Sequence, residues 1–242
     1  MKSIKFLIAI LIATASTSCH FDINLGRVDG NGNVITEDRP VTSSFEKVKG
    51  SAGIDVYLTE GSEEKIVVEA DENLMEYIET EIHNGKLTIG TTNGKSIGRS
   101  KAKKVFVTYT NLVSIASSSG ADVVANNPVK NETITLDASS GSNLEVEVFA
   151  KEVFVESSSG ADIKVTGKAS KLVADASSGS DINAKDLKVL TCNAEASSGA
   201  DITVNVKESL KASASSGGDV NYYGDPSVAT ARSGRSGSIH KM

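Results

Sequence analysis

One short phrase, Ser-Ser-Gly-x-Asp or Asn followed by aliphatic residues, recurs six times between Ser114 and Tyr223. Its glycines are Gly120, Gly141, Gly160, Gly179, Gly199 and Gly217, so successive copies lie 21, 19, 19, 20 and 18 residues apart. Such a regular period is typical of a solenoid, in which each repeat forms one coil that packs on its neighbours. A degenerate copy, SAGIDVYL from Ser51, indicates that the repeat begins earlier.

The residues around each glycine alternate between apolar and polar, as they do in a strand with one buried face. Apolar or small residues stand seven, five and three positions before the glycine, and again three and five positions after it. The first of these positions holds Val113, Ile134, Val153, Leu172, Cys192 and Leu210. Each coil is therefore expected to supply two short inward-facing strands joined at a bend. The sequence predicts an all-β fold, a parallel β-helix or closely similar β-solenoid of about 19–20 residues per coil.

The region before the regular coils predicts an irregular N-terminal cap rich in strands. Short alternating runs occupy residues 41–48, 54–59, 65–70, 79–83, 86–90 and 105–109. Residues 71–78, DENLMEYI, interrupt them with a short helical pattern, which Asp71 can cap and in which Leu74, Met75 and Ile78 share a face.

The first residues are typical of an export signal. Lys2 and Lys5 precede a short apolar run, and small residues lead to Cys19. This arrangement resembles a bacterial lipoprotein signal, which implies that Cys19 carries lipid; ordinary cleavage near Ser18 that leaves a free Cys19 thiol is the alternative. We therefore divide the chain into a signal peptide at 1–18, a tether at 19–40 and one solenoid domain at 41–242. Within that domain we expect N-terminal strands and cap at 41–110, six coils at 111–223 and a C-terminal cap or tail at 224–242.

The repeated phrase has a structural interpretation as the corner of a coil. Glycine permits a bend with positive φ, and Asp or Asn two residues later can bond local amides as an Asx turn. The paired serines before each glycine, such as Ser177 and Ser178, are expected to form hydroxyl ladders from coil to coil or to the backbone.

The acidic residue of the phrase also suggests calcium as a cofactor. Stacked coils would bring like charges within about 5 Å of one another, and a cation would neutralise them. The candidate ligands are Asp122, Asp162, Asp181, Asp201 and Asp219, with Asn143 in register. The period argues against calcium, because calcium-binding solenoids place a Gly-x-Asp turn every nine residues or so.

Catalysis finds little support in the sequence. His20, His83 and His240 all lie outside the six repeats, so no Ser-His-Asp set can be proposed. Cys192 stands in an inward column and is expected to be a core residue. Outward carboxylates such as Asp175 and Glu195 could serve a glycosidase, which needs two carboxylates at a set separation. These two are expected to share an outward face with Asp137, Glu156 and Lys211.

Charge gives two further expectations. The chain has 25 basic and 31 acidic residues, which makes nucleic acid an improbable partner. The basic run at residues 94–104, GKSIGRSKAKK, predicts a solvated loop, with a patch for anionic glycans or lipid headgroups as the alternative.

Several motifs together resemble one known family. They are FEKVKGSAGIDVYL from Phe45, VVEADENL from Val67, NGKLTI from Asn84, the six repeats, and the Y-x-G-x-P-x-V close at Tyr222. This series is similar to the putative auto-transporter adhesin, head GIN domain family, over roughly residues 41–239. The resemblance implies an exported or lipid-anchored bacterial envelope protein with a β-helical fold. It implies no established activity and no site residues.

We therefore expect a non-enzymatic cell-envelope module, anchored through Cys19, that presents its repetitive surface to a glycan or protein. The expected location is the outer membrane, on its periplasmic or outer side. A carbohydrate-active enzyme, either a glycosidase or a lyase, and a purely structural envelope protein are the alternatives. No ligand-binding residues and no oligomeric state can be assigned.

Overall fold

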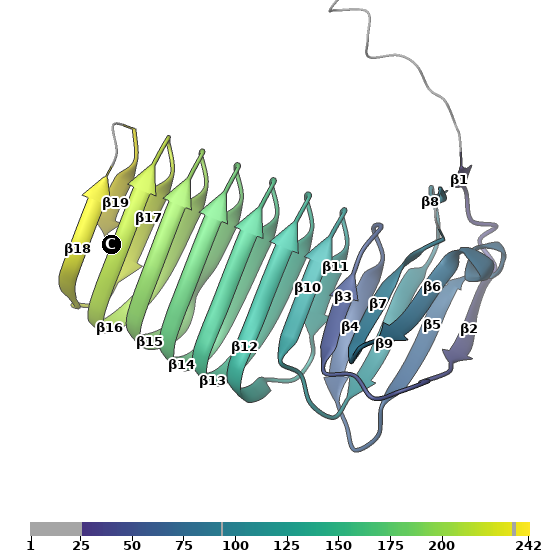
Figure 1. The fold of residues 1–242 in the computed structure, drawn as a ribbon. Coiled ribbons are helices and arrows are strands. Elements are labelled where there is room, and N and C mark those ends of the chain that lie inside the picture. Colours follow the sequence, from purple (N-terminus) through teal and green to yellow (C-terminus); the bar gives the residue numbers. More distant parts are fainter. Residues whose placement is uncertain (1–25, 93, 234–235) are drawn as a thin grey trace, which may run out of the picture.

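The structure, a computed structural model, describes residues 26–92, 94–233 and 236–242. It is an all-β molecule with one short 3₁₀ helix, in which a solenoid of parallel coils continues into a nearly closed mixed sheet (Figure 1). The predicted fold class is confirmed. In the described part of the chain, no helix is both long enough and apolar enough to span a bilayer.

The solenoid consists of parallel strands that stack in register (Figure 1). Its strands are β10 (Ser114–Ser118), β11 (Asp122–Ala125), β12 (Val129–Ser139), β13 (Asn143–Ser158), β14 (Asp162–Ser177), β15 (Asp181–Ser197), β16 (Asp201–Ser215) and β17 (Asp219–Tyr223). From β13 to β16, a single strand bends through almost a whole coil, from one Ser-Ser-Gly corner to the next. Every coil therefore has a tight corner at one edge and a wider bend at the opposite edge.

The predicted inward columns form the core. The column three residues after each glycine is at most 1% exposed in all six coils, from Val123 to Val220. The column five residues before the glycine is at most 3% exposed, from Ile115 to Ala212. Only at the ends of the columns are inward residues half-buried, as at Val113, Ala125 and Tyr222. The alternation of apolar and polar residues thus predicted the core correctly. Alternate side chains point inward, and neighbouring coils shield them from solvent.

The N-terminal cap begins with one more coil. Strands β3 (Lys47–Gly50) and β4 (Asp55–Glu60) pair in parallel with β10 and β11, and Asp55 lies opposite Asp122. Beyond them lie β2 (Val34–Arg39), β5 (Lys65–Asp71), β6 (Ile78–His83), β7 (Lys86–Thr91) and β9 (Lys103–Tyr109). The pairs β2–β5, β5–β9 and β6–β7 are antiparallel, so the parallel ladder ends here. The degenerate copy at Ser51 is confirmed as a coil.

Three details differ from the sequence-based expectations. Residues 34–39 of the predicted tether form β2, because their backbone completes the open edge of β5. Residues 41–46 are not part of a strand, since β3 begins at Lys47. At the other end, where a cap or tail was expected, β18 (Ser227–Ser233) and β19 (Ser238–Lys241) continue the parallel ladder on β16 and β17.

The short helix begins directly after Asp71, as the sequence predicted, but the Asp71 side chain has a different role from the one expected. Helix η1 (Glu72–Tyr77) is a 3₁₀ helix, and Leu74 and Met75 are its buried residues. The Asp71 side chain makes no capping bond to η1. It accepts instead from the backbone N–H groups of Gly32, Lys101 and Ala102 at 2.8, 3.1 and 3.0 Å. Asp71 therefore ties three segments together, a role that local sequence could not reveal.

Candidate functional site

The Ser-Ser-Gly corner is a turn of two left-handed residues. The second serine has φ between 51° and 58° in all six copies, and the following glycine has φ between 66° and 81°. The prediction of a positive φ at glycine is confirmed, but the strained serine before it was not expected. Two consecutive left-handed residues reverse the chain in the smallest space, which brings the two strands of a coil face to face.

The corners are joined from coil to coil by backbone bonds, not by the paired serine hydroxyls that we expected. The N–H of each of the first five glycines donates to the carbonyl of the second serine in the next copy, as from Gly141 to Ser159 at 3.0 Å and from Gly160 to Ser178 at 3.1 Å. In the described part of the chain, no hydrogen bond is found for the hydroxyls of these paired serines. The second serine of each pair is exposed, whereas the first is half-buried or, at Ser118, buried.

Buried hydroxyls near the corner come from two other positions, three residues before the glycine and one residue after it. Ser117 and Ser142, in successive coils, are fully buried and their hydroxyls lie 2.9 Å apart. Ser157 donates to the carbonyl of Ala161, and Ser180 donates to the carbonyl of Ser157, both at 2.8 Å. In the first four copies a serine at one position accompanies an alanine at the other. The variable residue of the phrase is thus an inward position, which the sequence analysis missed.

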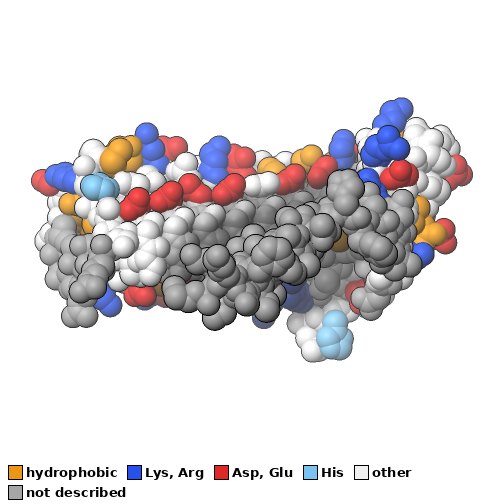
Figure 2. Space-filling view, turned by 90° about the horizontal axis from the view of Figure 1, so that it is seen from above, with side chains coloured by type: hydrophobic (Ala, Val, Ile, Leu, Met, Phe, Trp, Pro, Cys, Tyr) orange, Lys and Arg blue, Asp and Glu red, His pale blue; other side chains and the backbone are white. Residues whose placement is uncertain are grey.

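The candidate calcium ligands form the predicted column. Asp55, Asp122, Asn143, Asp162, Asp181, Asp201 and Asp219 pair in register along the solenoid. Figure 2, which looks onto the corner edge, shows a row of acidic side chains along the coils. Burial, followed by the charges of Asp162 and Asp201, raises the pKa of Asp181 above its usual range. Burial and the charge of Asp219 do the same for the pKa of Asp201.

The column has neither an Asx turn nor a recognisable metal cluster. Its one side-chain hydrogen bond runs from Asn143 Nδ2 to Asp122 Oδ1, at 2.6 Å, so the predicted bonds to local amides are absent within the described residues. No group of three or more His, Cys, Asp or Glu residues that could hold a metal occurs there either. Thermal melting with and without a chelator tests calcium directly, and an unchanged midpoint would remove it.

The outward carboxylates lie on one face, but Lys211 does not share their column. Asp137, Glu156, Asp175 and Glu195 follow one another in register. Lys211 pairs instead with Asn193, two residues along the strand, because it stands six and not four residues before its glycine. Burial and the neighbouring Glu195 raise the pKa of Asp175. The described residues place no histidine beside these carboxylates: His83 ends β6 and His240 lies in β19.

Cys192 lies in the core column, as the sequence analysis expected. It is 5% exposed, and burial raises the pKa of its thiol to about 12. A thiol with such a pKa stays protonated at neutral pH and is a poor nucleophile. The candidate lipidation site, Cys19, lies outside the described residues.

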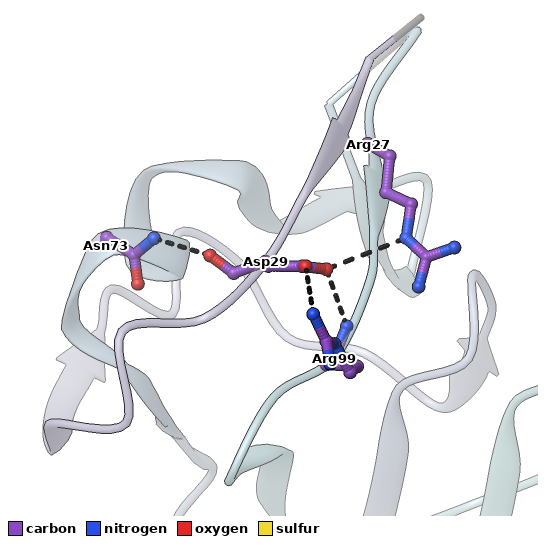
Figure 3. Close-up of polar contacts among 4 residues, drawn as sticks. All are labelled: Arg27, Asp29, Asn73 and Arg99. Carbon is purple, nitrogen blue, oxygen red and sulfur yellow. Dashed lines mark hydrogen bonds and ion pairs between the residues drawn. The ribbon is translucent and has the colours of Figure 1, made fainter. Parts of the chain in front are cut away.

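The basic run at residues 94–104 is largely used within the cap. Arg99 pairs with Asp29, which also pairs with Arg27, while the Asn73 amide donates to the Asp29 carbonyl at 2.9 Å (Figure 3). Lys104 pairs with Glu69, and Lys95 lies over the Tyr77 ring. The run therefore fastens β1 (Arg27–Val28) and β8 (Ser96–Ile97), which pair with each other, to the end of the molecule.

The edge opposite the corners carries a groove that the sequence analysis did not find. We call it the basic groove; it is formed where the coils bend and has a volume of about 890 Å³. Its lining residues are Lys130, Asn131, Glu132, Phe149, Ala150, Lys151, Lys168, Ala169, Ser170, Lys188, Val189, Leu190 and Lys207. That volume lies within the usual range for small-molecule sites.

Three adjacent columns explain the shape of the groove. Asn131, Ala150, Ala169 and Val189 pair in register along its middle, so its floor consists mostly of small or buried side chains. The flanking column on one side holds Lys130, Phe149, Lys168 and Lys188. The other flank holds longer side chains such as Lys151, Leu190 and Lys207. Large side chains beside small ones create a trough along the solenoid axis.

The two edges of the solenoid differ in charge. The corner edge carries the aspartate column, whereas the basic groove has five lysines and one acidic residue, Glu132. Opposite charges are thus separated across the width of each coil, although the whole chain has a net charge of −6. A field of this kind directs anions toward the basic groove and away from the corners.

Comparison with known proteins identifies the class and then the family. Four solved structures from Bacteroides and Parabacteroides share this solenoid fold, so the molecule belongs to the class of β-solenoid proteins. The family model described as "Putative auto-transporter adhesin, head GIN domain" matches residues 44–226. The chain belongs to this family, and the resemblance seen in its motifs is confirmed.

The similar structures extend over nearly the whole fold. A putative adhesin from Bacteroides fragilis NCTC 9343 is 20% identical, with a TM-score of 0.82 over 89% of this chain and 100% of the other. A protein from Parabacteroides distasonis ATCC 8503, described as a putative lipid binding protein, is 21% identical, with a TM-score of 0.76 over 89% and 99%. A putative adhesin from Parabacteroides merdae ATCC 43184 is 21% identical, with a TM-score of 0.70 over 90% and 99%. At these identities the likeness concerns the fold alone. Comparison with curated proteins gives no match.

Proposed function

We propose that this protein is a non-enzymatic binding module of the bacterial cell envelope, and that the basic groove is its binding site. The observation that carries the proposal is the groove itself, an apolar trough flanked by five lysines on an otherwise acidic solenoid. Membership of an adhesin family agrees with a binding role and with export. The lysines of the groove require an anionic ligand. The sequence analysis favoured a surface glycan or a protein.

Binding is tested on the chain from His20 to Met242 with an array of glycans and extracellular-matrix proteins. The groove variant Lys168→Glu/Lys188→Glu reverses two charges in one flank. Its matched control, Lys47→Glu/Lys211→Glu, makes the same change in net charge at two exposed lysines away from the groove. We expect a ligand whose signal is lost in the groove variant and kept in the control. Loss in both variants would point to a general charge effect and contradict the proposal.

The proposal includes anchoring by lipid at Cys19, on the outer membrane. A small-residue stretch before Cys19 supports it. Replacement of Cys19 by Ser should move the protein from the membrane fraction to the soluble fraction of the cell. A Cys19→Ser protein that stays with the membrane would exclude lipid at this residue.

A carbohydrate-active enzyme is the second candidate, because Asp175 and Glu195 are neighbours in one column and the pKa of Asp175 is raised. General acids of glycosidases have raised pKa values of this kind. The double variant Asp175→Asn/Glu195→Gln separates the two functions. If glycan cleavage is detected in the wild-type chain and lost in this folded variant, the enzyme is favoured over the binding module. Ligand binding that persists without any cleavage favours the module, and an absence of both leaves a structural role.

A further inference from the structure

Four of the five lysines of the basic groove lack acidic partners within the described residues, whereas two other lysines of the coils have them. Lys164 pairs with Glu145 and Lys171 with Glu152, each one coil away. Within the described residues, four groove lysines make no ion pair, and only the fifth, Lys151, pairs with Glu132. The four are Lys130, Lys168, Lys188 and Lys207. A group of uncompensated cations is a site for an external anion.

The groove also exposes apolar surface that a purely electrostatic site would not need. Phe149 is 40% exposed and Leu190 is 38% exposed, which places both among the few large apolar side chains that face solvent. The floor between the flanks includes Ala169 at 8% and Val189 at 2% exposure. Five successive coils line the groove over a length of about 19 Å at the usual strand spacing, and its apolar side chains come from the middle three coils.

From these two observations we propose that the basic groove binds a single-chain amphiphile that carries a phosphate head. Its acyl chain lies along the apolar floor between Phe149 and Leu190. Its phosphate pairs with Lys168 and Lys188, which are neighbours in one column about 4.8 Å apart along the axis. A phosphate monoester carries about −1.5 to −2 charges at neutral pH, which suits two adjacent ammonium groups. This inference rests on the proposed function and names its ligand class.

The lining chemistry favours such an amphiphile over a glycan. Sugar hydroxyls need acceptors as well as donors, yet lysine only donates. The acceptors in the groove are few, namely Asn131, Glu132 and Ser170. A glycan chain on Ala169 and Val189 would lose water from its hydroxyls without gaining partners, at a cost in free energy. An acyl chain has no hydroxyls to satisfy and gains from the same burial.

The test is titration calorimetry of the chain from His20 to Met242 with dodecyl phosphate, below the concentration at which it forms micelles. Hexyl phosphate has the same head and a shorter chain, and dodecyl maltoside has the same chain and a neutral head. Each buried methylene strengthens binding by up to about fourfold, so hexyl phosphate should bind at least about tenfold more weakly. Dodecyl maltoside should bind at least about tenfold more weakly as well, since it forms no ion pair.

Variants locate the binding in the groove. Lys168→Glu/Lys188→Glu should lower the affinity for dodecyl phosphate at least about tenfold. Lys47→Glu/Lys211→Glu should change that affinity by less than about twofold. Leu190→Asn removes an exposed apolar side chain. It should lower the affinity for dodecyl phosphate about threefold and leave the affinity for hexyl phosphate unchanged. Unchanged melting midpoints in all three variants show that the fold is intact.

Each contrary result has a distinct meaning. Equal affinity for hexyl and dodecyl phosphate would overturn the acyl site. Binding to vesicles of anionic phospholipid without binding of dissolved dodecyl phosphate would overturn the single-chain ligand and indicate that the groove contacts a bilayer surface. An acidic glycan or peptide that binds the wild type and not Lys168→Glu/Lys188→Glu, while dodecyl phosphate fails, would overturn this inference and leave the proposed function standing. If no tested ligand binds Lys168→Glu/Lys188→Glu more weakly than it binds the wild type, both this inference and the proposed function are wrong.

Discussion

Asp71 links three segments of the N-terminal cap through its buried carboxylate. It is fully buried, and its carboxylate accepts from the N–H groups of Gly32, Lys101 and Ala102. Burial opposes its ionisation, but these backbone donors, with the charge of Lys101, hold its pKa below the ordinary value. The charged form is therefore favoured by the folded state, and three segments far apart in sequence share one anion.

Replacement of Asp71 by Asn should cost about 2 kcal/mol in the free energy of unfolding at pH 7, because the amide turns a donor toward the backbone N–H groups. A lowered folded-state pKa gives stability that is present above the unfolded-state pKa of about 3.9 and is lost as pH falls through the lowered value. Denaturant unfolding at pH 7 and pH 3 should therefore show the difference between wild type and Asp71→Asn shrinking in acid. Asp38→Asn, at an exposed carboxylate paired with Lys65, is the control and should change stability by less than about 0.5 kcal/mol. A difference that grows in acid would contradict this account.

Alanine substitutions at Gly179 and Gly167 distinguish the cost of a left-handed φ from the cost of steric overlap. At Gly179, with φ of 69°, an added Cβ meets nothing within 4 Å, so Gly179→Ala should cost only the left-handed strain of about 1–2 kcal/mol. At Gly167, with φ of 107°, the added Cβ would overlap the Val148 carbonyl oxygen. Gly167→Ala should therefore cost more than about 3 kcal/mol or prevent folding. Urea unfolding of both variants checks the order, and equal costs would show that the coil can shift to make room.

At the scale of the coil, the buried hydroxyls act as a pairing device between successive corners. Ser142 donates to the carbonyl of Ser139 at 2.9 Å, accepts from the Ser139 N–H at 3.2 Å and contacts the Ser117 hydroxyl. From the first to the fourth copy the buried serine alternates between the two positions, and alanine occupies the position that serine leaves. We infer that this pattern disfavours slippage of one coil against the next.

A double-mutant cycle tests the pairing. Ser142→Ala should cost about 1–2 kcal/mol, because it leaves the Ser117 hydroxyl without its buried partner. Ser117→Ala should cost about 0.5–1 kcal/mol, since the Ser142 hydroxyl keeps its bonds to Ser139. The double variant should cost at least about 0.5 kcal/mol less than the sum. Ser157→Ala with Ser180→Ala is the matched control: Ser180 bonds the Ser157 carbonyl, which Ser157→Ala retains, so these two costs should add. Additivity at Ser117 and Ser142 would show that their hydroxyls act separately.

At the scale of the molecule, the sequence predicted the features that recur in every coil, and it did not reveal those that differ between coils or depend on distant pairing. The inward columns were recognised because aliphatic residues recur at fixed distances from each glycine, as Ile163, Ile182 and Ile202 do. The basic groove was missed because its flank changes from coil to coil, with Lys130, Phe149 and Lys168 at equivalent positions. Strand β2 was missed for another reason. Its antiparallel partner β5 lies some thirty residues away, and nothing local requires that pairing.

The separation of charge between the two edges has a cost in stability as well as a use. Ionised aspartates in register repel one another along the corner edge, and Asn143 relieves this in one coil by donating to Asp122. The fold thus tolerates an amide in the column. The acidic edge and the basic groove lie on opposite sides of each coil, so changing the first should leave ligand binding at the second intact.

Asp181→Asn tests the repulsion at its strongest point, between Asp162 and Asp201. A carboxyl whose folded-state pKa is raised opposes folding when it is ionised, and this penalty disappears as pH falls through the raised pKa because both states become protonated. Asp181→Asn should therefore raise the free energy of unfolding by about 0.5 kcal/mol at pH 7, and by less at pH 3 or in high salt. Asp186→Asn, an exposed carboxyl outside the column, is the control for net charge. If Asp181→Asn destabilises the protein at pH 7, the column is held by a bound cation or by hydrogen bonds to its carboxylates, and repulsion does not dominate this edge.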